Sequence, residues 1–159
     1  MSKPLVIILM GSKADMEHCT KISDACKGFG LDTVLRIGSA HKTPEHAVSI
    51  LKQYEADERP KVYITVAGRS NALSGFTDGS VSAPVIACPP PSESFGGADV
   101  YSSLRMPSGI APAVVLEPFN AALLAAKIFG VTNAEVRNQV RASQKRAAEK
   151  IIEDDASVK

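Results

Sequence analysis

The amino-acid sequence predicts an α/β fold in which helices cover both faces of a parallel sheet. Short apolar runs that are typical of strands alternate with longer segments that are typical of helices. Such alternation indicates βαβ units and a three-layer, doubly wound fold. The strands are also apolar without interruption, as in Leu5–Met10. Continuous apolar strands are buried on both faces, which is the situation in parallel sheets.

The individual elements follow from this alternation and from local stop signals. Gly28 and Gly30 are expected to end the first helix, because glycine is favoured just past a helix end. Thr43 and Pro44 suit the N-cap and first position of the second helix. The expected order is a strand over Leu5–Met10, a helix from Ala14 to about Gly28, a strand over Thr33–Ile37, a helix over Pro44–Glu55, strands over Val62–Ala67, Pro84–Cys88 and Ala113–Leu116, and a helix over Asn120–Phe129.

A further helix over 132–155 stands apart from the others. Thr132 and Glu135 have the spacing of a capping box at its start. The sheet already has enough helices to cover it. We therefore expect this segment either to pack on another subunit or to lie on its own domain. Its apolar residues fall close to one helical stripe, formed by Val136, Val140, Ala147, Ile151 and Ile152.

Composition narrows the classes of function. The chain has 159 residues and a net charge of +1, so we expect one domain over 1–159 and no basic field for nucleic acid. No apolar run approaches the length of a membrane span, and the predicted first strand begins at Leu5, so we expect neither a membrane span nor a signal peptide. Three cysteines without a CxxC motif favour reduced thiols and a cytoplasmic location. No residues have convincing metal-ligand spacing, so no metal is expected.

Ser39-Ala40-His41-Lys42 is the most informative stretch of the chain. It follows the second strand and precedes a helix, and loops at the carboxyl ends of parallel strands line the ligand crevice of such folds. An imidazole titrates near neutrality, and a lysine is a suitable partner for phosphate. The residues predict proton transfer by His41 beside an anion held by Lys42. The alternative is an exposed loop histidine beside a solvated lysine.

Two further strand ends carry polar residues. Gly11 and Ser12 open the first helix, where backbone N–H groups favour an anion, and Asp15 could accept from a ribose diol. Helix capping by Ser12 and Asp15 is the alternative. After the third strand, Gly68 permits close approach of a ligand. Next to it, Arg69, Ser70 and Asn71 could bind a carboxylate, or Arg69 could form a structural ion pair.

Five motifs together resemble the aminoimidazole ribonucleotide carboxylase family of purine biosynthesis. The resemblance spans nearly the whole chain. It implies a flavodoxin-like fold and a homo-octamer in which C-terminal helices reach neighbouring subunits. The motifs are Met10-Gly11-Ser12-x-x-Asp15, Ser39-Ala40-His41-Lys42, Ala67-Gly68-Arg69-Ser70-Asn71, Cys88-Pro89-Pro90 and Ser103-Leu104-Arg105-Met106-Pro107-Ser108-Gly109.

The resemblance also indicates a branch of that family. Class I members rearrange N5-carboxyaminoimidazole ribonucleotide, whereas class II members carboxylate aminoimidazole ribonucleotide directly with CO2. Class I members typically have arginine after the histidine and a Gly-Gly-Ala-Ala-His run after the third strand. This chain has Lys42 and Gly68-Arg69-Ser70-Asn71 at these places. The resemblance therefore implies the class II reaction, with CO2 as a substrate and no cofactor.

The resemblance implies a role for each candidate residue. His41 is the base that removes the ring proton, and the other candidates bind the nucleotide or CO2. They are Ser12 and Lys42 for the 5′-phosphate, Asp15 for the ribose, Gly68, Arg69 and Ser70 for CO2 or the carboxylate, and Gly11, Ser39 and Asn71 as further substrate-binding residues.

Two other functions remain open at this point. One is the class I mutase, and the other is a flavodoxin-like module that binds a nucleotide without catalysis. A phosphoacceptor receiver is disfavoured, because it needs acidic residues after its first and third strands. This chain has Gly11-Ser12-Lys13 and Gly68-Arg69-Ser70 there.

Overall fold

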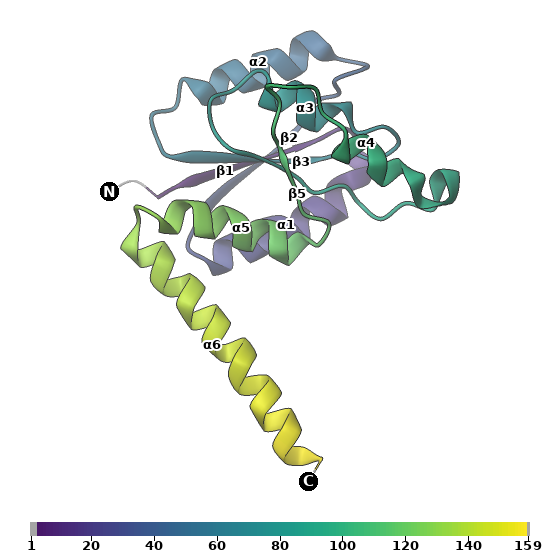
Figure 1. Cartoon of the computed structure of the whole chain (residues 1–159). Helices are drawn as coiled ribbons and strands as arrows, with labels where there is room; N and C mark the ends of the chain where they lie inside the picture. Colours follow the sequence, from purple (N-terminus) through teal and green to yellow (C-terminus); the bar gives the residue numbers. More distant parts are fainter. Residues whose placement is uncertain (1–2, 159) are drawn as a thin grey trace.

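A computed structural model, which describes residues 3–158, shows a five-stranded parallel sheet with helices on both faces (Figure 1). The strand order β2-β1-β3-β4-β5 is that of flavodoxin-like folds, so the predicted fold class is confirmed. The elements are β1 (Leu5–Met10), the 3-10 turn η1 (Lys13–Asp15), α1 (Met16–Gly28), β2 (Asp32–Ile37), α2 (Pro44–Glu55), β3 (Lys61–Val66), α3 (Ala72–Asp78), β4 (Val85–Ala87), the 3-10 segment η2 (Ser94–Val100), α4 (Tyr101–Leu104), β5 (Ala113–Val114), α5 (Pro118–Gly130) and α6 (Ala134–Ser157).

Strand β1 lies at the centre of two hydrophobic cores. All six of its residues are buried. Val6 and Ile8 face a cluster that includes α1 and α5, whereas Ile7 and Leu9 face the cluster beneath α2 and α3. Successive side chains of a strand point to opposite faces of the sheet, so burial on both faces requires an apolar residue at every position. This explains the uninterrupted apolar sequence of β1.

The strand and helix limits differ from the sequence prediction where turns intervene. The first helix begins at Met16 and not at Ala14, because Lys13–Asp15 form a 3-10 turn. The strands predicted over Pro84–Cys88 and Ala113–Leu116 are shorter, at Val85–Ala87 and Ala113–Val114. Helices α3 and α4 were not predicted at these positions. Both are short and rich in serine, glycine or threonine, so they lack a clear helical period of apolar residues.

The end of α1 confirms the predicted role of Gly30, whereas Gly28 is the last residue of the helix itself. Gly30 has φ 78°, a left-handed conformation that favours glycine. Its N–H donates to the carbonyl of Lys27 at 2.9 Å, and the N–H of Leu31 donates to that of Cys26 at 3.1 Å. This pair of hydrogen bonds is a Schellman motif, which ends the helix and satisfies two of its last carbonyl groups.

Helix α6 begins at a different capping residue from the one predicted. Asn133 is the N-cap, and its Oδ1 accepts from the N–H of Val136 at 3.1 Å, so the capping box at Thr132 is wrong. Arg137 Nη1 donates to the carbonyl of Gly130 at 2.8 Å. An arginine can satisfy the last carbonyl groups of a helix in this way. These contacts fix the corner between α5 and α6.

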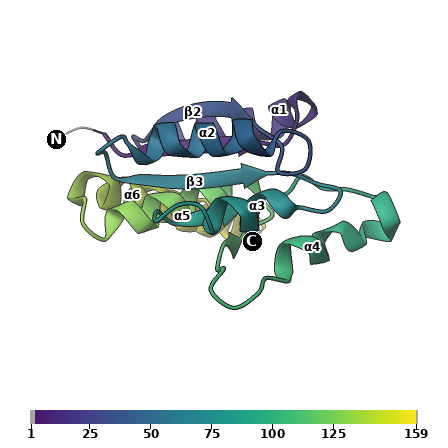
Figure 2. The same cartoon turned by 90° about the horizontal axis from the view of Figure 1, so that it is seen from above.

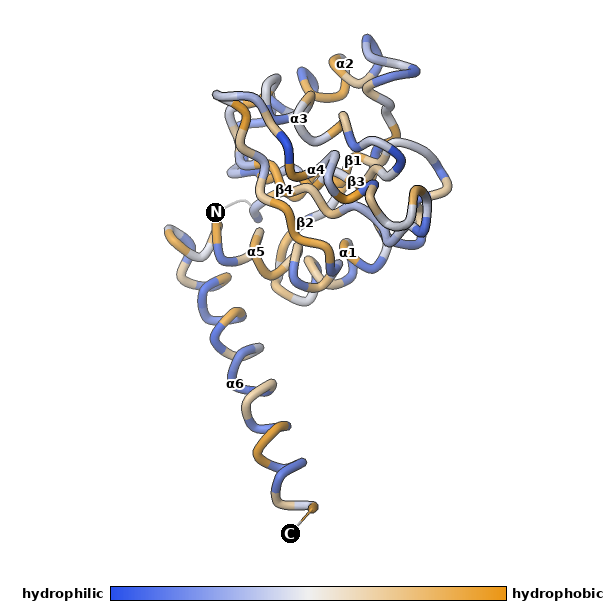
Figure 3. Tube along the Cα trace, turned by 45° about the vertical axis from the view of Figure 1, so that its right-hand side comes forward, coloured by the Kyte–Doolittle hydropathy of each residue, from blue (hydrophilic) through white to orange (hydrophobic). Residues whose placement is uncertain are grey.

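Most of α6 projects away from the domain (Figure 1). Its buried residues are Val136 and Val140, which lie in its first two turns. Farther along, the helix is largely hydrophilic with hydrophobic bands near its end (Figure 3). Ile151 and Ile152 are 69% and 68% exposed. The alternative in which this helix lies on its own domain therefore holds only for its start, and packing on another subunit stays a prediction.

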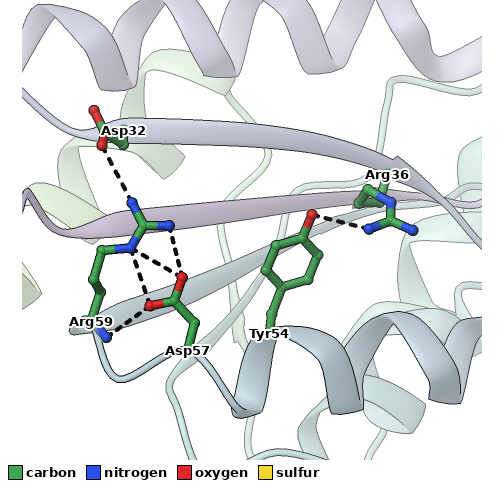
Figure 4. A network of polar contacts seen from close by, with 5 residues as sticks. All are labelled: Asp32, Arg36, Tyr54, Asp57 and Arg59. Atoms are coloured by element: carbon green, nitrogen blue, oxygen red, sulfur yellow. Dashed lines mark hydrogen bonds and ion pairs between the residues drawn. The ribbon is translucent and has the colours of Figure 1, made fainter.

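A polar network ties β2 to the loop before β3, at the end of the sheet where these strands begin (Figure 4). The guanidinium of Arg59 donates to the carboxylate of Asp57 at 2.7 Å and lies 3.4 Å from that of Asp32. The hydrogen bonds from Arg59 hold the pKa of Asp57 at about 2. A separate contact lies toward the other end of β2, where Arg36 donates to the hydroxyl of Tyr54 at 3.0 Å (Figure 4).

No helix among residues 3–158 is long and apolar enough to cross a membrane.

Two threonine hydroxyls in the sheet predict opposite effects on stability. The Thr65 hydroxyl is buried and has no hydrogen-bond partner among the described residues, whereas Thr33 Oγ1 lies 2.7 Å from Ser23 Oγ. Thr65→Val removes an unsatisfied polar group, so we expect the free energy of unfolding to rise by up to about 1 kcal/mol. Thr33→Val leaves the Ser23 hydroxyl unpaired and should lower it by about 1 kcal/mol. Urea unfolding measures both, and equal losses would contradict this account.

Candidate active site

The loops after β1, β2 and β3 leave the sheet at the same edge. Met10 is paired with both Ile37 and Val66, so the three strands end in register. Hydrogen bonds from the N–H of Gly11 to Val66 at 2.9 Å and from Gly38 to Met10 at 3.0 Å extend the pairing into the loops. Figure 2 shows the arrowheads of β2 and β3 on the same side, with the segment around α4 beyond them. The predicted site residues therefore lie along one edge.

The loop after β2 is held by its own hydrogen bonds. Ser39 N donates to Thr43 Oγ1 at 3.0 Å, and Lys42 N donates to Ser39 Oγ at 3.1 Å. Thr43 occupies the predicted N-cap of α2 and Pro44 its first turn, but the Thr43 side chain makes no capping hydrogen bond. Its hydroxyl is used inside the loop. Ser39 and Thr43 thus fix the backbone on both sides of His41.

His41 and Lys42 present free side chains at this edge. Both are exposed, and neither side chain has a hydrogen bond or ion pair with any residue in 3–158. An imidazole and an ammonium group without protein partners can engage a ligand without first breaking a contact. Because the backbone on either side is fixed, a ligand would meet them in a defined place.

The loop after β1 brings Ser12 and Asp15 together. Ser12 Oγ donates to Asp15 Oδ2 at 3.3 Å. The two residues stand at the N-caps of η1 and α1, but neither side chain makes a capping hydrogen bond. The alternative of side-chain capping is therefore wrong. Gly11 lies close to the neighbouring loop, since a Cβ placed on it would be 3.4 Å from that of Ala67.

The loop after β3 has a strained backbone. Arg69 and Ser70 have φ values of 53° and 71°, in the left-handed region, where a residue other than glycine costs about 1–3 kcal/mol. The N–H of Arg69 donates to Asp99 Oδ2 at 3.2 Å, and that of Asn71 donates to Ser102 Oγ at 2.8 Å. Among the described residues, the Arg69 guanidinium forms no ion pair, so the alternative of a structural ion pair is not found there.

Asn71 differs from its neighbours because its side chain is buried and fully engaged. Its Oδ1 accepts from the N–H of Ser74 at 3.2 Å, which caps α3, and its Nδ2 donates to Ser103 Oγ at 3.0 Å. Asn71 is 2% exposed. The structure therefore places it beneath the loop, where it joins α3 to α4, while the side chains of Arg69 and Ser70 are exposed.

A cavity of about 280 Å³ opens beside Gly68. It lies between the loops after β3 and β4 and the segment before α4. The sequence drew attention to Gly68 and to the prolines after Cys88, but it gave no signal for Asp99, which contributes from the distant 3-10 segment. The cavity is lined by Ala67, Gly68, Pro89, Pro90, Pro91, Ser92, Gly97, Asp99, Val100 and Leu116.

His18 lies near this edge but makes a different kind of contact. Its Nε2 is 3.4 Å from Cys88 Sγ, at the end of β4. Burial lowers the pKa of His18 and raises the pKa of Cys88 to about 12. Both groups are therefore neutral near pH 7, and Cys88 is not a reactive thiolate. This contact indicates a structural role for His18. Cys19 and Cys26 are also buried and free.

Comparisons with known proteins identify the family. The family model described as AIR carboxylase matches residues 5–150. The chain belongs to the AIR carboxylase family. The family resemblance seen in the sequence motifs is thereby confirmed.

Within 3–158, no three His, Cys, Asp or Glu residues are grouped so that they could hold a metal ion.

Relatives of this family match the chain closely. The phosphoribosylaminoimidazole carboxylase of Treponema denticola is 64% identical over 157 residues, which cover 99% of this chain and 99% of that protein. The enzyme of the same name from Archaeoglobus fulgidus is 51% identical over 153 residues, or 96% of this chain and 84% of that protein. The crystal structure of Treponema denticola PurE matches with a TM-score of 0.97 and 64% identity over 99% of each chain.

His18 predicts a pH dependence of stability. Burial dominates the lowering of its pKa and Lys21 adds to it, whereas Cys88, Asp15 and Glu117 oppose it. The unfolded chain therefore binds a proton more readily than the folded one. The stabilising contribution is complete above the ordinary pKa of about 6.5 and is lost as the pH falls through the lowered value.

We expect His18→Gln to flatten the fall in the free energy of unfolding between about pH 7 and pH 5. Urea unfolding across this range measures the effect. His46→Gln, on the exposed part of α2, is the control and should keep the wild-type slope. Identical slopes for wild type and His18→Gln would show that this histidine does not contribute.

Proposed function

We propose that this protein carboxylates 5-aminoimidazole ribonucleotide with CO2 to give 4-carboxy-5-aminoimidazole ribonucleotide, in the class II manner and without ATP. The observation that carries the proposal is the arrangement of free side chains at one sheet edge. His41 and Lys42 follow β2, and Arg69 and Ser70 follow β3. The names of the relatives support the same reaction.

The proposed mechanism has two steps. The ring carbon of the aminoimidazole, which is nucleophilic like that of an enamine, attacks CO2 and forms the new carbon–carbon bond. The resulting tetrahedral carbon bears both a proton and a carboxylate. His41 then removes the proton, and the electron pair returns to the ring. In the reverse direction, the protonated His41 delivers a proton to the carbon and CO2 leaves.

The nucleotide is held by the loops after β1 and β2 in this proposal. Ser12 donates a hydroxyl hydrogen bond to the 5′-phosphate, and Lys42 pairs with its charge. Asp15 accepts from the ribose hydroxyls. In the structure the Ser12 hydroxyl donates to Asp15 Oδ2 at 3.3 Å, which places the two side chains together at one loop. A serine hydroxyl has one proton, so in this proposal the hydroxyl turns from Asp15 to the phosphate when the nucleotide binds. Gly11 and Ser39 shape the backbone around them.

In this proposal CO2 is bound at the loop after β3. Gly68 opens on the cavity of about 280 Å³, whose walls are largely apolar side chains and glycine. An apolar space excludes water and suits an uncharged molecule such as CO2. Arg69 and Ser70 follow Gly68 in the chain and have exposed side chains, and both can pair with the carboxylate once it forms. Asn71 supports this loop from below.

The assembly and setting are proposed on the resemblance. The exposed Ile151 and Ile152 on the projecting part of α6 support packing against a neighbouring subunit, as in the homo-octamer expected for the family. The protein acts in the cytoplasm on a small nucleotide, without nucleic acid or membrane partners. On the same resemblance we propose that it uses no cofactor and that CO2 enters as a substrate.

The class II reaction predicts CO2-dependent turnover without ATP. Purified protein is given 5-aminoimidazole ribonucleotide and bicarbonate, and product is followed spectroscopically. We expect formation well above the uncatalysed rate. Turnover of N5-carboxyaminoimidazole ribonucleotide alone would assign the protein to class I. Calorimetric binding of nucleotides with no turnover in either assay would favour the non-catalytic module.

The role of His41 predicts a separable effect on catalysis. General acid–base catalysis typically contributes about 10²–10⁴-fold, so His41→Asn should lower kcat by a factor in this range. Affinity for the nucleotide should change little, because the phosphate lies with Ser12 and Lys42. His46→Asn, on exposed α2, is the matched control and should keep full activity. Near-normal turnover by His41→Asn would remove this residue from the mechanism.

A further inference from the structure

Asp99 joins the segments that surround the cavity. Its Oδ2 accepts from the N–H of Arg69 at 3.2 Å and from the hydroxyl of Ser92 at 3.1 Å. Its main-chain carbonyl accepts from Ser102 Oγ at 2.7 Å, and that hydroxyl in turn accepts from the N–H of Asn71 at 2.8 Å. One residue of the 3-10 segment thus contacts the loops after β3 and β4 and the start of α4.

The turn that Asp99 holds is unfavourable by itself. Arg69 and Ser70 are in the left-handed region, which side-chain-bearing residues rarely adopt. Such a conformation persists only when its surroundings determine it. The hydrogen bond to a carboxylate is stronger than one to a neutral acceptor. The donor of this hydrogen bond is the N–H of Arg69, the first of the two left-handed residues.

The position of Asp99 relates this turn to the cavity. Asp99 lines the cavity together with Gly68, and Ser92 lies on the opposite loop. Loss of the carboxylate would remove the hydrogen bonds to Arg69 and Ser92 together, and these two residues lie on the loops at either side of the cavity. The Arg69 guanidinium makes no ion pair among the described residues, so its direction depends on the backbone beneath it.

We propose that Asp99 is a positioning residue for the carboxylation site. It acts through the backbone of Arg69 and the hydroxyl of Ser92, and it sets where the Arg69 and Ser70 side chains meet CO2 or the new carboxylate. This proposal rests on the proposed function, and it extends that function to a residue outside the three loops that carry the candidate ligand-binding groups.

Steady-state kinetics of Asp99→Ala test the proposal. A misplacement of about 1 Å can lower catalysis by about 100-fold, so we expect kcat/KM for CO2 to fall by about 10- to 100-fold. KM for the nucleotide should stay within about twofold, because the phosphate-binding residues lie on other loops. Asp99→Asn retains an acceptor oxygen and should recover part of the activity. A crystal structure of Asp99→Ala should show Arg69 outside the left-handed region.

Asp78→Ala is the matched control. Asp78 Oδ2 also accepts from a backbone N–H, that of Ala111 at 2.8 Å, but it does not line the cavity. We expect a similar loss of stability without the change in kcat/KM for CO2. Equal effects of the two variants, or wild-type kinetics in Asp99→Ala, would overturn the positioning role. Absence of turnover in the wild-type protein would instead overturn the proposed function.

Discussion

The in-register parallel pairing of β1 with β2 and β3 is the constraint on which the rest of the structure depends. Met10 is opposite both Ile37 and Val66, so three loops begin at the same level. A shift of one residue would exchange the two faces of a strand. It would move each β1 side chain into the core on the other side of the sheet, where it meets different neighbours, and would move one loop away from the others. The register of β1 with its two neighbours therefore determines both the packing of the cores and the position of the candidate site.

The residues of the candidate site have two kinds of role: some hold the backbone of the loops, and others have free side chains that can contact a ligand. Asn71 and Thr43 are engaged in hydrogen bonds within the protein. The side chains of His41, Lys42 and Arg69 have no such partners among the described residues. The supporting residues hold turns that would otherwise relax, including two left-handed residues after β3. Rigid backbone with free side chains is the arrangement that places reacting groups before a ligand arrives.

The sequence predicted those features that repeat along the chain or depend on one residue type. The apolar run Leu5–Met10 and the stop at Gly30 are examples, since burial on two faces and positive φ each demand a particular kind of residue. It did not predict α3, because this short helix lacks a helical period of apolar residues and is stabilised by its packing against the sheet. Nor did it predict Asp99, because that residue reaches Arg69 from 30 positions away. Local patterns carry no information about such long-range hydrogen bonds.

The most direct test of this account is a crystal structure of the protein with 4-carboxy-5-aminoimidazole ribonucleotide bound. We expect the phosphate between Ser12 and Lys42, the ring beside His41, and the carboxylate toward Gly68 and Arg69. A second cavity, lined by Phe29 and Thr132 among others, lies at the opposite end of the sheet, and a nucleotide bound there would contradict this assignment. So would a nucleotide at the predicted edge whose reacting ring carbon lies beyond the reach of the His41 imidazole.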